Sequence, residues 1–238
     1  MDTTTRQLPD NCAKQHALTR ESSSAARRAI TAGILAAAER VFARGGFEGA
    51  RMAEIAAEAG LPKANLHYYC GTKEQLYRTV LESILTEWLD AAAEWIVPER
   101  HPADALAGYV RAKLAHARHR PEASRIFAGE LLRGAPLLMP FLAGELRQRV
   151  AAMSEVIRDW SARGLMRAVP PAHLFFAIWA MTQTYADFDV QIRAVLGTGT
   201  LDDKAFADAD TMVTALVLSG CGVADPQATM SNGDRSAA

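Results

Sequence analysis

The feature that most constrains this chain is a series of helix-breaking residues set into an otherwise helical pattern. From residue 25 to residue 221 the apolar residues recur at the spacing of amphipathic helices, and no extended run of alternating Val, Ile and Thr bounded by turn residues is present. Alanine, the strongest helix former, is abundant. The sequence therefore predicts an all-α fold.

Glycine and proline divide this region into nine predicted helices. Gly45-Gly46 ends the first, because glycine readily adopts the left-handed conformation that closes a helix. Thr72 is placed to cap the fourth helix, with Glu74 and Gln75 in its first turn. The predicted bounds are 25–44, 52–59, 62–69, 73–96, 103–119, 122–133, 137–163, 171–196 and 203–221.

The same pattern predicts four segments along the chain. Residues 1–24 lack periodicity and are expected to form a flexible arm, and residues 222–238 are expected to form a flexible tail. Between them, residues 25–72 hold three helices and residues 73–221 hold six, which suggests a small domain followed by a larger one.

Charge is unevenly distributed between these parts. The whole chain carries 26 Lys and Arg against 27 Asp and Glu, which argues against a histone-like basic protein and against an acidic disordered one. Residues 1–78 carry 11 basic and 8 acidic side chains, whereas residues 79–238 carry 15 and 19. The first part is therefore mildly basic and the second mildly acidic.

The sequence also limits the cellular compartment and the kinds of metal or disulfide site that can be expected. No stretch approaches the roughly 20 uninterrupted apolar residues of a membrane helix, and the polar N-terminus has no signal-peptide pattern. Three cysteines, Cys12, Cys70 and Cys221, have neither paired spacing nor metal-ligand spacing. We therefore expect a cytoplasmic protein with no membrane span, no disulfide scaffold, no metal and no cofactor.

The stretch from residue 45 to residue 76 predicts a helix-turn-helix, in which one short helix braces another that enters the major groove of DNA. Exposed polar residues of the second helix and cations at the starts of neighbouring helices can reach bases and phosphates. The candidate DNA-binding residues are Arg51, Lys63, Ala64, Asn65, His67, Tyr68 and Lys73. Two short helices joined by glycine also occur in many all-α proteins, so spacing alone leaves DNA binding open.

Residues 28–76 resemble the DNA-binding domain of the TetR family of transcriptional regulators. The resemblance implies a dimeric repressor whose paired motifs read a palindrome, with a ligand-binding domain behind each motif. It rests on Phe42-Ala43-Arg44-Gly45-Gly46-Phe47, Ile55-Ala56-Ala57-Glu58-Ala59-Gly60, Lys63 through Tyr69, and Thr72-Lys73-Glu74.

Two positions depart from the family pattern. Members usually place Thr or Ser at the position of Ala50, where the hydroxyl caps the second helix, and its loss costs about 1 kcal/mol if nothing replaces it. They usually place Phe-Pro where this chain has Cys70-Gly71, a change that shrinks an anchor and loosens the turn into the fourth helix.

The second domain resembles the pyrimidine-utilisation (Rut) repressor subfamily, which implies release from DNA on binding uracil or thymine. The matching residues are Glu122-Ala123-Ser124-Arg125-Ile126-Phe127, Gly134-Ala135-Pro136-Leu137-Leu138-Met139, Ile178-Trp179-Ala180, Thr182-Gln183 and Tyr185-Ala186-Asp187-Phe188.

Three of these side chains recur every four residues and share one helix face: Trp179 to stack on a base, Gln183 to read its edge and Asp187 to accept a ring N–H. Glu130 and Lys113 can project inward from other helices, and Tyr185 lies on a different face, where it can serve ligand or a dimer interface. An aromatic stripe at this spacing is more often simply core.

We therefore expect a homodimer that binds operator DNA and a small-molecule effector. The expected dimer faces carry Phe175, Phe176, Ile178, Met212, Val213, Leu216 and Val217. Alternatives are a TetR-type regulator with another aromatic or apolar effector and a helical interaction module that does not bind DNA. An enzyme is not expected, because repeated Glu-x-x-His, a Gly-rich phosphate loop and a nucleophile elbow are all missing.

Overall fold

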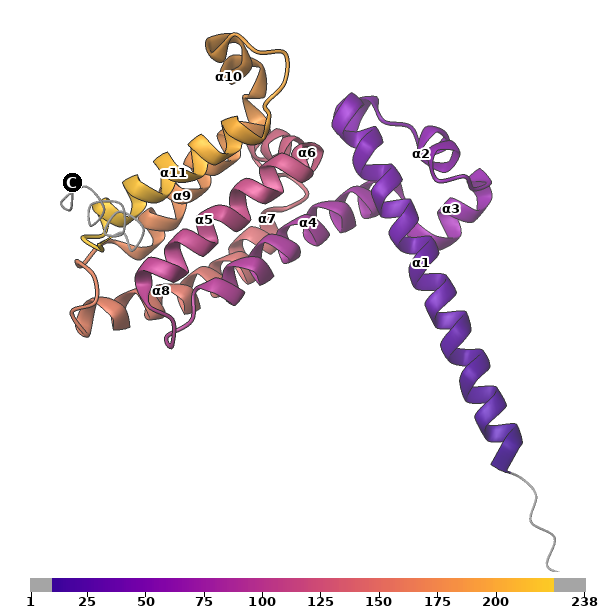
Figure 1. The fold of residues 1–238 in the computed structure, drawn as a ribbon. Coiled ribbons are helices and arrows are strands. Elements are labelled where there is room, and N and C mark those ends of the chain that lie inside the picture. The colour runs from indigo at the N-terminus through magenta and orange to yellow at the C-terminus, as the bar shows by residue number, and fades with distance from the viewer. Residues whose placement is uncertain (1–9, 225–238) are drawn as a thin grey trace, which may run out of the picture. The chain divides into compact units, whose positions relative to one another are not determined.

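The computed structural model describes the backbone of residues 10–224 and the side chains of residues 25–224. Every regular element in this part is helical (Figure 1), which confirms the predicted all-α fold. The elements are α1 (Asp10–Gly49), α2 (Met52–Glu58), α3 (Lys63–Cys70), α4 (Lys73–Trp95), α5 (Pro102–His119), α6 (Pro121–Leu132), α7 (Met139–Phe141), the π-helical turn η1 (Leu142–Leu146), α8 (Arg147–Ala162), α9 (Pro171–Asp187), α10 (Asp189–Leu196) and α11 (Asp203–Gly220).

The described part divides into two compact units between Tyr77 and Arg78. In the first unit, α1 buries one face made of Ile34, Val41, Phe42 and neighbouring alanines. The Phe42 ring meets the edge of Tyr77, at the start of α4, with ring centres 4.7 Å apart. This aromatic contact fixes the beginning of α4 against the end of α1.

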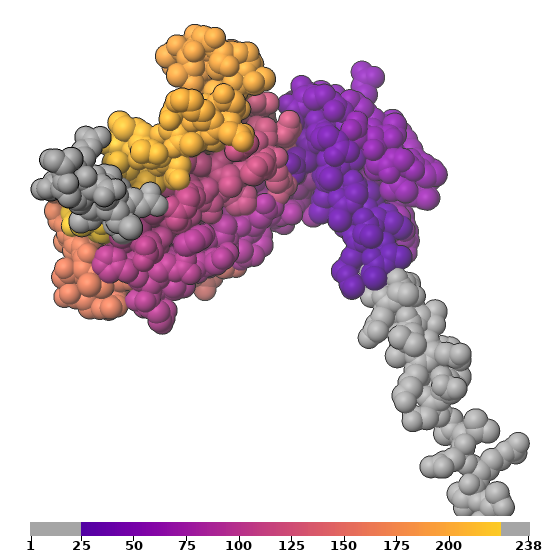
Figure 2. Space-filling model, in the orientation of Figure 1, coloured from indigo at the N-terminus to yellow at the C-terminus, as the bar shows by residue number. Residues whose placement is uncertain are grey.

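The second unit is a helical bundle in which α5 is central. It packs against both α9 and α11, and its Tyr109 lies 6.3 Å from the Phe175 ring of α9. Trp160 of α8 is fully buried in the same core. A short helix, α10, projects from this bundle (Figure 2), and none of its residues is buried.

Three predicted helices differ from those observed. Helix α1 already begins at Asp10, where the sequence predicts an arm, and it continues past a kink at Gly46 (φ 63°) to Gly49. The predicted helix 137–163 contains a π-helical turn, η1, and the predicted helix 171–196 is interrupted at Phe188 (φ −119°). Neither glycine nor proline lies beside the break at Phe188, so the breaker pattern could not reveal it. By contrast, η1 contains Gly144 and closely follows Pro140, two breakers that the predicted helix 137–163 ran through.

The two ends of the chain are described only in part. The predicted arm lies outside the described residues for positions 1–9, and the predicted tail lies outside them from residue 225. Val223, at the start of the predicted tail, is buried, and its N–H donates to the Leu218 carbonyl at 2.9 Å. The second unit therefore extends past residue 222.

Candidate functional site

Helices α2 and α3 form the predicted helix-turn-helix. Gly60 (φ 67°) makes the turn, and the Leu61 N–H donates back to the Ala56 carbonyl at 2.9 Å. Ile55, Ala56 and Leu66 are buried beneath the motif. The opposite face of α3 is exposed and carries Lys63, Ala64, Asn65, His67 and Tyr68. The predicted readers of DNA thus share one solvent-facing surface.

Ion pairs hold α2 against α1. The Glu58 carboxylate accepts hydrogen bonds from Arg40 at 2.8 Å and from Arg44 at 3.0 Å. These two bonds lower the pKa of the Glu58 carboxyl below its usual value. Because all three side chains are partly exposed, the pairs orient α2 rather than supply much stability.

Lys73 does not project toward a phosphate as predicted. Its ammonium group donates to the carbonyls of Ala50 at 3.2 Å and Glu48 at 3.4 Å, and it lies 4.6 Å from the centre of the Phe47 ring. The chain at the end of α1 leaves carbonyls without helical partners, and the Lys73 ammonium at the start of α4 satisfies two of them. Lys73 therefore anchors the start of α4, and Arg51 remains exposed at the N-cap of α2.

The two departures from the family pattern have distinct structural effects. The N-cap of α2 is Arg51 rather than Ala50, no side chain caps it, and Ala50 is buried. At the other departure, Gly71 adopts φ 66° and ψ −129°. The turn there is closed by a capping box: the Thr72 N–H donates to Gln75 Oε1 at 2.8 Å and the Gln75 N–H donates to Thr72 Oγ1 at 3.2 Å.

His67 and Tyr68 also have contacts within their own unit. His67 Nδ1 lies 3.1 Å from the Gly71 carbonyl oxygen, which accepts a hydrogen bond from the ring. Tyr68 is 72% exposed, and the Arg27 guanidinium lies 5.7 Å from its ring centre. His67 therefore closes the end of α3 with one nitrogen, and Tyr68 stays available at the surface.

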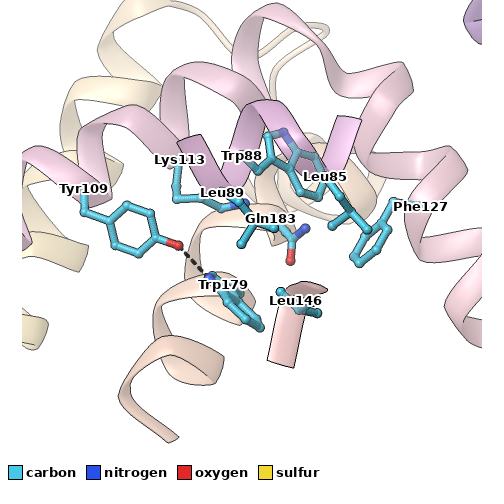
Figure 3. A pocket seen from close by; sticks show the side chains of 9 residues that line it. All are labelled: Leu85, Trp88, Leu89, Tyr109, Lys113, Phe127, Leu146, Trp179 and Gln183. Atoms are coloured by element: carbon cyan, nitrogen blue, oxygen red, sulfur yellow. Dashed lines mark hydrogen bonds between the residues drawn. The ribbon is translucent and has the colours of Figure 1, made fainter. Parts of the chain in front are cut away.

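The second unit contains a small, partly open cavity of about 30 Å³ between α4, α5, α6, η1 and α9 (Figure 3). Its walls are mostly aromatic and aliphatic, with two polar side chains among them. The lining residues are Leu85, Trp88, Leu89, Tyr109, Lys113, Phe127, Leu146, Trp179 and Gln183. A mostly apolar cavity with a few polar groups is typical of a small-molecule site.

Two of the predicted ligand residues, Trp179 and Gln183, line this cavity together. The Trp179 N–H donates to the Tyr109 hydroxyl at 2.6 Å, which fixes the indole (Figure 3). Burial raises the pKa of the Tyr109 hydroxyl, so it stays protonated. The Gln183 carboxamide makes no hydrogen bond within the described part of the chain. Its oxygen and its NH₂ group are both free to pair with a ligand.

Lys113 also lines the cavity and is only 3% exposed. Its ammonium nitrogen lies 4.0 Å from the centre of the Trp88 ring, a cation–π contact. Burial lowers the pKa of the Lys113 ammonium to about 7, and the nearby Asp187 opposes that shift. The cavity thus holds a base that is poised between its charged and neutral forms at neutral pH.

Three other predicted ligand residues are used elsewhere. Glu130 is buried beyond the cavity, where its carboxylate accepts from the Leu137 N–H at 2.8 Å and from Arg133 at 3.0 Å, closing the turn after α6. Asp187 accepts from the Ser124 hydroxyl at 2.6 Å. Tyr185 packs on the Phe206 ring, with centres 6.0 Å apart. None of the three lines the cavity.

Two family models match this chain. Residues 34–80 match the model described as bacterial regulatory proteins of the tetR family, and residues 81–224 match the model of the C-terminal region of YcdC-like proteins. The chain belongs to the TetR family. It is thus a DNA-binding transcriptional regulator of a ligand-responsive type, and its relatives are regulators rather than enzymes.

Individual TetR-family relatives agree with this assignment. The HTH-type transcriptional regulator RutR of Escherichia coli K12 is 41% identical over 196 residues, which cover 81% of this chain and 92% of RutR. The crystal structure of the transcriptional regulator SCO4942 of Streptomyces coelicolor is similar, with a TM-score of 0.60 and 29% identity over 79% of this chain and 96% of that one.

AibR, solved with isovaleryl coenzyme A and operator DNA, has the same fold, with a TM-score of 0.60 and 22% identity over 77% of this chain and 96% of AibR.

Among the described residues 10–224, none of the helices is long and apolar enough to cross a bilayer.

Sequence reasoning missed most of the cavity wall of this TetR-family chain. Trp88 of α4 and Phe127 of α6 meet edge to face, with ring centres 5.3 Å apart, and Tyr109 bonds Trp179. The apolar spacing of α4 predicts that Trp88 faces inward, but an inward residue can equally fill a core. Only the arrangement of α4, α5, α6 and α9 distinguishes the two.

Proposed function

We propose that this TetR-family chain is a repressor that leaves its operator when a pyrimidine base, uracil or thymine, enters the cavity of the second unit. The observation that carries the proposal is the Gln183 carboxamide, which lines an aromatic cavity without a hydrogen-bond partner in the described chain. The resemblance to pyrimidine-utilisation regulators supplies the candidate ligand. Such a repressor acts in the cytoplasm, where operator DNA is.

The chemistry of the cavity fits a flat base with a polar edge. Uracil presents an N–H donor between two carbonyl acceptors, and a carboxamide can accept from the first and donate to one of the others. The indoles of Trp88 and Trp179 supply surfaces on which the ring can stack. The Gln183 side chain is half-buried and has no partner in the described chain, so a ligand that pairs with it gains affinity and selectivity.

Release from DNA follows from linkage between the two sites. A base that binds better to a conformer unable to fit the operator shifts the population toward that conformer. Operator DNA must then weaken base binding by the same factor. We test this with electrophoretic mobility shifts of the DNA upstream of the chain's own gene, with and without uracil or thymine. If the protein does not shift this DNA in the absence of ligand, the proposed repressor is refuted. If it shifts the DNA equally with and without both bases, the proposed pyrimidine effector is refuted.

Replacing Gln183 with leucine will abolish the response to uracil while DNA binding persists. The apolar side chain has a similar volume but cannot pair with the base, so we expect base affinity to fall about 5- to 150-fold, from about 1–3 kcal/mol. The measurement is the uracil concentration that half-releases operator DNA. Gln191→Leu on the exposed α10 is the matched control and should respond like wild type.

For DNA, we propose that α3 enters the major groove. Asn65 is suited to pair with an adenine edge and Lys63 to contact a phosphate, and His67, Tyr68 and Arg51 add contacts to bases or backbone. Ala64 offers a small apolar surface that allows close approach. All six are exposed on the first unit, whereas Lys73 is excluded because its ammonium is satisfied internally.

The proposed homodimer uses a smaller face than the sequence predicts. Phe175, Ile178, Val213 and Val217 are buried in the core of their own protomer, so they do not serve the dimer interface. Phe176 of α9 and Met212 and Leu216 of α11 are about half exposed or more. Large exposed apolar side chains on two helices in contact mark an association surface.

Leu216→Glu will therefore convert the protein to a monomer. A charge in the centre of an apolar interface is left without a partner, and its desolvation opposes association. Sedimentation at micromolar concentration should show half the wild-type mass, with loss of operator binding. Leu132→Glu, at the 88% exposed end of α6, is the control. If the Leu216→Glu protein is still a dimer, the interface lies on another surface.

A further inference from the structure

We propose that Lys113 sets the chemical class of the effector: its ammonium group takes a carbonyl or carboxylate oxygen of a flat ligand, and binding draws a proton into the cavity. The inference rests on the proposed function only in that it concerns the same cavity. It excludes purely apolar aromatic effectors, which the resemblance alone leaves open.

The first observation is geometric. Lys113 is only 3% exposed and lines the cavity. Its side chain makes no hydrogen bond with any described residue. Its nearest cation-binding group is the face of Trp88, at 4.0 Å. An ammonium group has three donors, and a ring face satisfies them poorly. The ammonium nitrogen is not sealed off in the core, so an oxygen of a ligand in the cavity can reach it and accept from it.

The second observation is the charge around this group. From α4, α6 and η1 the neighbours Trp88, Phe127 and Leu146 are neutral, and from α9 Gln183 is neutral. Asp187 of α9 is the acidic group that acts on Lys113, but Ser124 already occupies one of its oxygens. His116, further along α5, has a pKa lowered by burial and is mostly neutral near pH 7. Positive charge at Lys113 is therefore under-compensated.

These two observations predict a linked proton. Because burial lowers the pKa of Lys113 to about 7, the empty cavity loses its positive charge as the pH rises above 7. A ligand oxygen favours the ammonium form and raises that pKa, so binding takes up a proton above pH 7. The affinity for an uncharged ligand is therefore highest below pH 7 and falls as the pH rises.

The test compares three flat probes on the full-length protein: uracil, a cyclic imide; benzoate, a carboxylate; and indole, which carries no oxygen. Thermal stabilisation is measured for wild type, Lys113→Met and the control Lys204→Met, whose side chain is 78% exposed. We expect uracil or benzoate, but not indole, to stabilise wild type and Lys204→Met. Lys113→Met should lose about 10- to 100-fold in affinity for that probe.

The pH profile of wild type is a second readout that does not depend on a variant folding. Uracil stays uncharged between pH 6.5 and pH 8.5, and its affinity should fall about tenfold or more across that range, in line with a pKa of about 7. The Lys113→Met profile should be flat.

The outcomes separate this inference from the proposed function. Stabilisation by benzoate and not by uracil would remove the pyrimidine effector and leave the role of Lys113 standing. Stabilisation by indole alone, by none of the probes, or equally in wild type and Lys113→Met would overturn the role of Lys113. A pH-independent uracil affinity in wild type would do the same.

Discussion

Asn65→Ala will weaken operator binding by about 30-fold to 25,000-fold without unfolding the protein. A bidentate amide–adenine contact discriminates by about 1–3 kcal/mol, and a symmetric dimer loses it twice. Asn65 is exposed on α3 and supports no packing, so its removal leaves the buried Leu66 and Ile55 in place. The loss should therefore appear in DNA binding and not in the melting temperature.

The measurement is a mobility-shift titration at one fixed salt concentration, since phosphate contacts make any affinity depend on salt. The control is Gln148→Ala, which removes a similar exposed amide from α8 in the other unit and should bind operator like wild type. An equal loss in both variants, or none in Asn65→Ala, would show that α3 is not the reading helix.

Gly108→Ala will lower the stability of the second unit by about 2–3 kcal/mol, despite the better helix propensity of alanine. A Cβ at Gly108 would lie 2.0 Å from Trp95 Cε3 and 2.2 Å from Cζ3, so α4 and α5 must separate or the indole must move. The Trp95 ring is itself held by Arg100, whose guanidinium lies 4.3 Å from its centre. Overpacking of a rigid ring has costs of this size.

Thermal denaturation measures this effect, and for a protein of this size the loss corresponds to a drop of about 5–10 °C. Gly129→Ala is the matched control inside α6, where the nearest side-chain atom to the new Cβ is Arg133 Nη1 at 3.7 Å. Because alanine is the better helix former, that variant should gain about 0.5–1 kcal/mol. If both variants change the stability in the same direction, the close approach of α4 and α5 at Gly108 is contradicted.

The sequence predicts the helices well because local chemistry decides them. Helix-breaking residues place the ends of α2, α5 and α6 to within one residue. The sequence also predicts Thr72 as the cap of the fourth helix, and Thr72 forms a capping box with Gln75. The break at Phe188 was not predictable in the same way. Asp189, which follows it, pairs with Arg125 of α6 as well as with Arg193, so a contact from a distant helix helps to set this boundary.

The cavity shows the same limit. Trp179, Gln183 and Asp187 share a helix face, as their spacing predicts, but eight residues along a helix span about 12 Å. The first two therefore line the cavity, while Asp187 lies beyond it beside Ser124. Glu130 and Lys73 are predicted correctly to lie on helices, but the sequence does not predict which backbone groups their side chains contact.

The backbone at Gly71 has a consequence for how this sequence can change. Proline is confined to φ near −65°, so the Phe-Pro pair usual in the family cannot be restored at residue 71 while that residue keeps φ 66°. A side chain there would also meet Gln75 Oε1 at 2.0 Å and disturb the capping box. The Cys-Gly and Phe-Pro versions of this junction are thus alternative solutions separated by an evolutionary barrier. The barrier lies at residue 71, because proline can enter there only together with a new conformation of the turn.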